Sequence, residues 1–288
     1  MSLLKRFQLV EKLGRGSFGD IYKGIDKQTN EAVAMKIESK IEKKGLEGQL
    51  KQENIIYKEL RNVKINPNLY WPQVKLFGTN GKGQSVLIMD LLGPDLDALL
   101  NLEILNHSQV RHYAVKMIHL LEIFHGKGYV HRDLKPQNFC LHLKDKSEIF
   151  LIDYGLAKKY CVDGKTHIPY SQKRSLKGTV RYASLNTHLS VEQSRRDDLI
   201  SLAYIIVFMV KGSLPWQHKP KNHENESKEE MYSRVMVKKM ACTFEELTQD
   251  ILEPLRTNLM TFLFYVNSLL FEEKPDYKFC KSLFIMEN

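Results

Sequence analysis

The feature that most constrains the fold of this chain is a pair of polar motifs, His131-Arg-Asp133-Leu-Lys135-Pro-Gln-Asn138 and Asp153-Tyr-Gly155. Each polar residue alone would be an ordinary loop residue. Together the motifs place two carboxylates, a lysine and an amide at fixed spacing. The chain must therefore adopt a fold in which loops from separate stretches bring these groups to one place.

Phosphoryl transfer is the chemistry that this set of groups serves. It needs a carboxylate that accepts the proton of an attacking hydroxyl, oxygen ligands for a metal ion, and a cation near the γ-phosphate. Asp133 would be the base, Asn138 and Asp153 the metal ligands, and Lys135 the cation. The combined string is typical of protein kinases.

A glycine motif near the N-terminus, Gly14-Arg-Gly16-Ser-Phe-Gly19, has the G-x-G-x-x-G spacing. Glycine allows a backbone to approach phosphates closely. Alone, the motif also fits a dinucleotide-binding fold or a flexible hairpin. A dinucleotide motif would open a helix, however, whereas here a strand precedes the motif and Ile21-Tyr-Lys-Gly24 opens another. The context therefore favours a kinase-type phosphate loop.

A lysine and a glutamate follow this loop. Period-two alternation puts Ala34 and Lys36 on one face of an expected strand, where a small residue beside a lysine suits a flat adenine next to phosphates. In the next expected helix, Glu53 lies within an apolar stripe. Because an unpaired buried carboxylate is unfavourable, Lys36 is its natural partner. A lysine at a strand end and a glutamate at the solvent edge of the stripe remain the alternatives.

The periodicity of the apolar residues predicts an α+β fold. Short alternating runs predict strands, and spacings of three and four predict helices, with a hinge at Asp90–Gly93 between them. The expected domains are a β-rich N-lobe, residues 1–92, and a mainly helical C-lobe, residues 93–288. Expected strands are Phe7–Lys12, Asp20–Ile25, Glu31–Glu38 and Ser85–Met89; expected helices are Leu46–Arg61, Ser108–Gly128 and the buried Leu199–Val210; Lys219–Glu230 is expected to be an exposed loop.

Composition indicates the cellular compartment and the class of binding partners. The formal net charge is +9, which favours acidic partners such as phosphoproteins, acidic peptides or nucleic acid. No stripe of basic and aromatic residues supports nucleic-acid binding. The four cysteines lie far apart, and the N-terminus lacks the apolar stretch of a secretory signal. We therefore expect a cytosolic or nuclear monomer that needs neither a membrane nor nucleic acid.

Several further motifs narrow the resemblance from protein kinases in general to one family. From about Phe7 to about Phe284, the chain resembles the casein kinase I family of protein kinases. These motifs are Leu91-Leu-Gly-Pro94, Asp153-Tyr-Gly155 in place of the usual Asp-Phe-Gly, Ala157-Lys-Lys-Tyr160, His167-Ile-Pro-Tyr170, Gly178-Thr-Val-Arg-Tyr-Ala-Ser-Leu-Asn186, Glu192-Gln-Ser-Arg-Arg-Asp-Asp-Leu199, Gly212-Ser-Leu-Pro-Trp216 and Lys274-Pro-Asp-Tyr277. The resemblance implies a bilobal protein-kinase fold and transfer of phosphate from ATP, with Mg²⁺, to serine or threonine in proteins.

The resemblance also implies site residues. Asp198 would support the catalytic loop from below. The residues implied in catalysis are Asp133, Lys135, Lys36, Glu53 and Thr179, and those implied as Mg²⁺ ligands are Asn138 and Asp153. Those implied around ATP are Leu13, Gly14, Gly16, Ser17, Gly19, Ile21, Ala34, Lys36, Met89, Asp90, Leu92, Cys140 and Ile152. Cys140 lies where the family usually has leucine. Two interpretations are open: it is a small buried apolar residue, or it is a thiol in the ATP site that reacts with electrophiles.

Substrate choice follows from the same resemblance, because the family prefers acidic or already phosphorylated proteins. Arg181, Arg174 and Lys177 would bind the substrate anion. Where relatives carry a basic run, however, this chain has Glu229, Glu230 and Met231, which puts recognition of a priming phosphate in doubt.

Three functions other than an active protein kinase are compatible with parts of this sequence. A pseudokinase scaffold would bind nucleotide or a partner without catalysis, but it commonly lacks one of the groups present here. A phosphotransferase for a small molecule usually lacks Gly178-Thr179 and the peptide-positioning segment through Asn186. A nucleic-acid-binding protein would require the basic and aromatic stripe that is missing.

Overall fold

The computed structural model describes residues 5–16, 19–38, 48–61, 71–161, 163–164, 166–172, 177–217 and 226–285. The chain forms two compact units. The first comprises Met1–Pro94 and Cys140–Gly155, and the second comprises Asp95–Phe139 and Leu156–Asn288. The division into lobes 1–92 and 93–288 stays a prediction.

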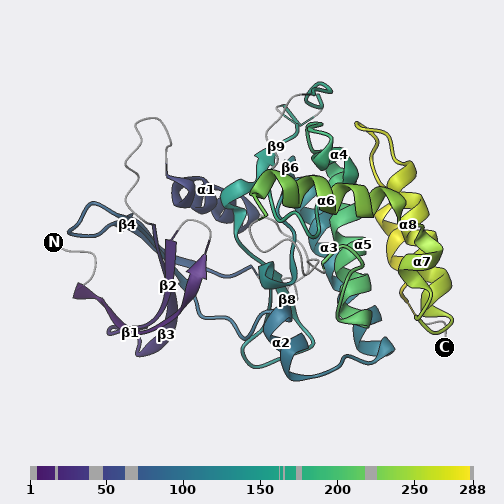
Figure 1. Ribbon diagram of the computed structural model, residues 1–288. Coiled ribbons are helices and arrows are strands. Elements are labelled where there is room, and N and C mark those ends of the chain that lie inside the picture. The colour runs from purple at the N-terminus through teal and green to yellow at the C-terminus, as the bar shows by residue number, and fades with distance from the viewer. Residues whose placement is uncertain are drawn as a thin grey trace. The chain divides into compact units, whose positions relative to one another are not determined.

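The first unit is built on an antiparallel five-stranded sheet with the strand order β1-β2-β3-β5-β4 (Figure 1). One face of the sheet carries the apolar core, which includes Val33, Met35 and Ile88. This confirms the alternation read from the sequence. The strands are β1 (Phe7–Gly16), β2 (Gly19–Asp26), β3 (Glu31–Glu38), β4 (Val74–Thr79) and β5 (Ser85–Asp90); the short strands β7 (Phe139–Leu141) and β8 (Ile149–Leu151) pair separately.

Helix α1 (Gln49–Arg61) packs on β4 and β5 and begins later than the predicted Leu46. Residues 46 and 47 lie outside the described residues, and Gly48 is not helical. The reason lies in Glu38 at the end of β3. Its carboxylate accepts a hydrogen bond from the Gln49 main-chain N–H at 2.9 Å, and so satisfies a donor at the helix N-terminus.

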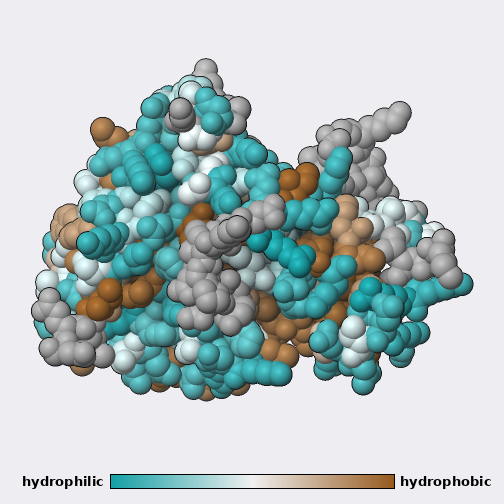
Figure 2. Space-filling model, turned by 180° about the vertical axis from the view of Figure 1, so that it is seen from behind, coloured by the Kyte–Doolittle hydropathy of each residue, from teal (hydrophilic) through white to brown (hydrophobic). Residues whose placement is uncertain are grey.

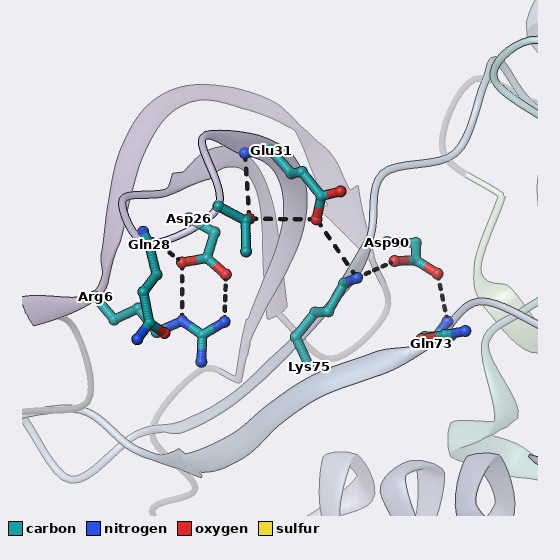
Figure 3. A network of polar contacts seen from close by, with 8 residues as sticks. Arg6, Asp26, Gln28, Glu31, Gln73, Lys75 and Asp90 are labelled. Carbon is teal, nitrogen blue, oxygen red and sulfur yellow. Dashed lines mark hydrogen bonds and ion pairs between the residues drawn. The ribbon is translucent and has the colours of Figure 1, made fainter.

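Ion pairs lie at both edges of this sheet, one between the start of β1 and the end of β2 and the other between β4 and β5 (Figure 3). Arg6 donates to both carboxylate oxygens of Asp26, and Lys75 lies 3.0 Å from Asp90. The second oxygen of Asp90 accepts a hydrogen bond from the Gln73 main-chain N–H at 2.8 Å. Because its side chain is held in this way, Asp90 has a defined orientation at the end of β5.

The Arg6–Asp26 pair makes stability depend on pH. Hydrogen bonds from Arg6 lower the pKa of Asp26 to about 2, although burial opposes them. In the unfolded chain the pKa of an aspartate is about 3.9, so the pair stabilises the fold above that pH and loses its effect as pH falls towards 2. We expect Asp26→Asn to be less stable than the parent at pH 6, and the difference to shrink at pH 3, in urea denaturation. An equal difference at both pH values would contradict this.

The second unit is mainly helical, as predicted, and the α+β class is confirmed. The contacts of α3 with α5 and α9, and of α5 with α8, form its centre. Its helices are α2 (Leu96–Leu102), α3 (His107–Gly126), α4 (Leu185–His188), α5 (Arg195–Lys211), α6 (Lys228–Ala241), α7 (Phe244–Thr248), α8 (Leu255–Ser268) and α9 (Tyr277–Ser282); β6 (Tyr129–Val130) pairs with β9 (Lys158–Lys159), and η2 (Pro136–Asn138) is a 3₁₀ turn.

Capping residues explain where the predicted helices end. A reciprocal hydrogen-bonded cap between Asn106 and Gln109 starts α3, and Gly128, with φ of +81°, lies beyond its end. A similar cap between Ser227 and Glu230 starts α6, so the last residues of the predicted Lys219–Glu230 loop are helical. Residues 219–225 of that loop lie outside the described residues.

The surface and the core have the expected polarity. Figure 2 shows one face of the molecule, on which hydrophilic residues predominate and hydrophobic areas are limited. The central part of α5 is fully buried, which confirms the predicted core helix. In the described part of the chain, no helix has the length and apolar character needed to cross a membrane.

Candidate active site

The glycine motif lies where β1 ends and β2 begins, as predicted; Ser17 lies outside the described residues. Gly16 pairs with Gly19 across the two strands. A Cβ atom at Gly14 would meet nothing within 4 Å, whereas one at Gly19 would lie 2.1 Å from the carbonyl oxygen of Ile37. The fold therefore requires glycine at position 19. Around Gly14 the space is open, which suits close approach by a phosphate.

The two glycines should respond differently to alanine. Gly19→Ala would force β2 away from β3, and we expect it to lower the free energy of unfolding by about 1–3 kcal/mol, as overpacking does. Gly14→Ala should leave stability within about 0.5 kcal/mol of the parent, as at an unconstrained surface site, and weaken ATP binding. Thermal melting and calorimetric titration with ATP would measure both. Equal loss of stability in the two variants would contradict the assignment.

Lys36 is the centre of a buried ionic cluster in the first unit. Its ammonium lies 2.8 Å from Glu53 Oε2 and 2.6 Å from Asp153 Oδ1. The side chains of Lys36 and Glu53 are only 9% and 2% exposed. The pairing of Lys36 with Glu53 that the sequence predicted is therefore confirmed, and Asp153, far along the chain, joins the same cation.

The charge of Lys36 is secured by its neighbours. Burial alone would lower its pKa, but the two carboxylates outweigh that effect and raise the pKa above the ordinary lysine value. Burial raises the pKa of Glu53, and contact with Lys36 opposes this rise. A permanently charged lysine, held by carboxylates on two sides, is suited to contact the phosphates of a nucleotide.

The sheet register brings together residues that were predicted around the adenine. Ile21 lies opposite Lys36, and Ala34 lies opposite Met89, so these four residues share the sheet face away from the apolar core. Met89 is buried, and Ile21 and Ala34 are half-buried. The other predicted positions are Leu13, half-exposed in β1; Asp90, half-buried at the end of β5; Leu92, half-buried after β5; Cys140, buried in β7; and Ile152, half-buried after β8.

Asp153 has an unusual main-chain conformation. Its φ is +67°, which is strained for a residue other than glycine and is found most often at functional sites. The next residue, Tyr154, is fully buried. Its ring packs edge-on against Tyr57 of α1 at 4.8 Å, and its hydroxyl donates to the Leu151 carbonyl. The replacement of the usual phenylalanine by tyrosine is thus accommodated, because the hydroxyl has a partner.

The loop His131–Asn138 of the second unit, which is the predicted catalytic loop, holds Asp133 by both carboxylate oxygens. Thr179 donates to Oδ1 at 2.7 Å, and the ammonium of Lys135 lies 2.8 Å from Oδ2. Asn138 donates its amide to the Asp133 carbonyl at 2.7 Å, which leaves its side-chain oxygen as the atom that it presents to a ligand. The loop therefore displays an oriented carboxylate, a cation and an amide oxygen within a few residues.

Gly178 brings Thr179 to this loop. It has a φ of +95°, and a Cβ atom there would lie 2.2 Å from the carbonyl oxygen of Arg132. Only glycine combines that conformation with so close an approach. The contact of Thr179 with Asp133 therefore has a steric cause.

A buried polar chain supports the loop from behind. Asp198, at the start of α5, accepts hydrogen bonds from the main-chain N–H groups of His131 at 2.7 Å and Arg132 at 2.9 Å, which confirms its predicted support of the loop. Its carboxylate also lies 2.9 Å from His125 Nε2, and His125 Nδ1 lies 2.6 Å from the Tyr277 hydroxyl. Sequence reasoning did not predict these contacts. A histidine at a helix end gives no distinctive signal, and Tyr277 entered only as part of the motif Lys274-Pro-Asp-Tyr277, without a role.

Arg132 is held by groups that the sequence also did not reveal. Its Nε donates to the Leu156 carbonyl at 2.8 Å, and its guanidinium lies 3.8 Å from Glu192. Glu192 is buried, lies 2.6 Å from Lys158, and donates its main-chain N–H to Ser171. One carboxylate thus connects the catalytic loop to the segment that follows Asp153.

The predicted anion-binding residues are described only in part. Lys177 is exposed and Arg181 is half-buried, with its guanidinium near the rings of Tyr182 and Phe208. Arg174 lies outside the described residues. The acidic residues in place of a basic run stabilise the start of a helix. Glu229 and Glu230 lie in the first turn of α6, where negative charge is favourable, and Glu230 also forms part of the N-terminal cap. Met231 is the next residue of the helix.

The predicted site residues thus form two groups, one in each unit. The first group contains Lys36, Glu53 and Asp153, and the second contains Asp133, Lys135, Asn138 and Thr179. Their roles in catalysis stay predictions. Within each group, the structure shows the hydrogen bonds and ion pairs described above.

One comparison with known proteins bears on this arrangement. The family model described as the protein kinase domain matches residues 7–270, which include the glycine motif and both groups of site residues. The predicted protein-kinase fold, with a β-rich N-terminal part and a helical C-terminal part, is thereby confirmed. This match is to the protein kinase domain as a whole and not to one of its subfamilies.

Proposed function

The chain belongs to the protein kinase domain family, and we propose that it is an active kinase that transfers the γ-phosphate of ATP to serine and threonine hydroxyls of proteins. Membership of this family indicates a transferase whose substrates are proteins. The activity, the hydroxyl specificity and the casein kinase I type are the finer parts of the proposal.

The observation that carries the proposal is the setting of Asp133. Thr179 and Lys135 hold its two oxygens, so the carboxylate has one orientation from which to accept the proton of a substrate hydroxyl. A pseudokinase scaffold has no need of a carboxylate fixed in this way. The Thr179 contact supports serine and threonine as acceptors, because lysine and threonine at these two positions are the pattern that the resemblance associates with them.

ATP and Mg²⁺ are the cofactors that the residues fit. Asp153 and Asn138 would bind Mg²⁺, because a carboxylate and an amide oxygen are among its preferred ligands. When bound, the ion neutralises negative charge on the phosphates. Lys36 would contact the α- and β-phosphates, with its orientation fixed by Glu53, and Lys135 would contact the γ-phosphate beside Asp133.

Acidic proteins are the proposed substrates, as in the casein kinase I family. The net charge of +9 and the basic residues Arg181, Lys177 and Arg174 support this choice. Glu229, Glu230 and Met231 reduce the positive charge where the family has a basic run. We therefore propose recognition of acidic side chains rather than dependence on a priming phosphate, by a monomer in the cytosol or nucleus.

The test is a transfer assay with labelled ATP, Mg²⁺ and casein, followed by identification of the phosphorylated amino acids, beside a calorimetric titration with ATP. We expect phosphoserine and phosphothreonine, and more transfer to acidic peptides than to matched neutral ones. A Lys36→Met variant should lose transfer. ATP binding without transfer by the parent would favour the pseudokinase scaffold, and phosphotyrosine alone would overturn the proposed specificity.

A further inference from the structure

Lys239, on α6, is a buried lysine whose role neither motif nor family match assigns. It is only 4% exposed. Within the part of the chain that the structure describes, its ammonium contacts main-chain carbonyls and aromatic rings rather than a carboxylate. A buried ammonium is unfavourable unless its donors are satisfied, so a leucine or methionine would serve better if the position only needed to be filled.

The groups that satisfy Lys239 belong to one segment, Thr179–Ser184. Its ammonium donates to the carbonyl of Val180 at 2.9 Å and to that of Ala183 at 2.5 Å. The carbonyl between them, of Arg181, accepts a hydrogen bond from the indole of Trp216 at 2.7 Å. Three carbonyls of the segment therefore accept hydrogen bonds from two side chains.

Aromatic rings complete the surroundings of the ammonium. It lies 5.1 Å from the ring centroids of both Tyr204 and Trp216, within the range of cation–π attraction. His188 of α4 is also close: burial and then the nearby Lys239 lower its pKa to about 4, so it adds no second positive charge at neutral pH. Burial also lowers the pKa of Lys239 itself well below the ordinary lysine value. The hydrogen bonds to carbonyls and the contacts with aromatic rings, rather than an ion pair, therefore hold this side chain in place.

The same segment also contacts the loop His131–Asn138. The main-chain N–H groups of Tyr182 and Ala183 both donate to the Thr179 carbonyl, closing a turn. The Thr179 hydroxyl donates to Asp133. Lys239 and Asp133 are therefore joined through one hydrogen-bonded turn, and displacement of the turn would move the residue that orients the base.

We propose that Lys239 is a positioning residue that fixes the segment Thr179–Ser184 for binding of the protein substrate. The proposal rests on the proposed function, since it assigns the segment to the protein and not to ATP. Loss of the Lys239 side-chain donors should therefore impair use of the protein substrate. It should leave ATP binding nearly unchanged, because most of the residues proposed around ATP lie in the other unit.

The test compares Lys239→Met with Lys239→Arg, and with Lys238→Met, a control that removes the same charge from the neighbouring position. We expect Lys239→Met to raise the KM for an acidic protein substrate about tenfold, the equivalent of one charge-assisted hydrogen bond, with the KM for ATP within about twofold of the parent. Lys239→Arg should recover part of this loss, and Lys238→Met should behave as the parent. A parental KM for protein in Lys239→Met, or equal loss in the control, would overturn the proposal.

Hydrogen exchange keeps the inference separate from the proposed activity. The amides of Tyr182 and Ala183 should exchange faster in Lys239→Met than in the parent, whereas amides of α3 should not. If the parent transfers no phosphate, the proposed function fails, and unchanged exchange in this turn would then overturn the role of Lys239 independently. If Lys239→Met does not fold, Trp216→Phe, which removes the donor to the Arg181 carbonyl, should give a smaller effect in the same direction; parental values there would also overturn the proposal.

Discussion

An Asp133→Asn variant will transfer phosphate to casein about 100-fold to 10,000-fold more slowly than the parent, the range that loss of a general base produces. The amide has nearly the same shape as the carboxylate, and its oxygen can still accept the hydrogen bond that Thr179 donates at 2.7 Å. It cannot accept a proton from a substrate hydroxyl. The amide also cannot offer Lys135 a second oxygen in place of the one now 2.8 Å away.

Because the loss is chemical rather than structural, ATP affinity should stay within about threefold of the parent, a difference of less than one kcal/mol. Initial rates and a calorimetric titration would measure the two properties. Asp145→Asn, on an exposed loop after β7, removes the same charge and is the control. Asp133→Asn with a tenth or more of the parental rate would mean that another group accepts the proton, or that the reaction does not depend on a general base.

The sequence predicted most of what depends on local spacing. Alternation located β3 and placed Lys36 opposite the core-facing Val33 and Met35, because side-chain direction in a strand has a strict period. An unfavourable charge in an apolar stripe predicted the pairing of Glu53 with Lys36, which the structure shows at 2.8 Å. In both cases one elementary rule sufficed, and no distant residue had to be known.

Contacts between distant parts of the chain could not be predicted in this way. Lys238 and Lys239 are adjacent lysines, and the sequence around them does not distinguish one from the other. Only tertiary packing buries Lys239, against the rings of Tyr204 and Trp216. Likewise, nothing in the spacing around Glu192 indicates that it lies beside Arg132 and Lys158. The predicted helix starts differ from the observed ones for a related reason. Helix caps depend on polar side chains, and the apolar pattern says nothing about where those side chains point.

An Asp198→Asn variant should lose both stability and activity. Asp198 offers separate oxygens to the main-chain N–H groups of His131 and Arg132, and an amide has only one oxygen. One buried N–H would therefore face the amide nitrogen and lose its partner, which costs about 1–3 kcal/mol. Arg132, with φ of +69°, depends on such contacts to keep a strained conformation. The loop that carries Asp133 would then be free to move.

We expect the free energy of unfolding of Asp198→Asn to fall by about 2–3 kcal/mol, since the bonds lost are to a charged acceptor. We expect kcat to fall about 100-fold, the loss that a small misplacement of a catalytic group produces. Tyr277→Phe is the graded comparison: it removes only the 2.6 Å contact to His125 and leaves both loop contacts of Asp198 in place. Its loss should be near 1 kcal/mol with less than tenfold loss of kcat. Urea denaturation and initial rates would measure both variants, and equal effects of the two substitutions on kcat would show that the loop is not held through the carboxylate of Asp198.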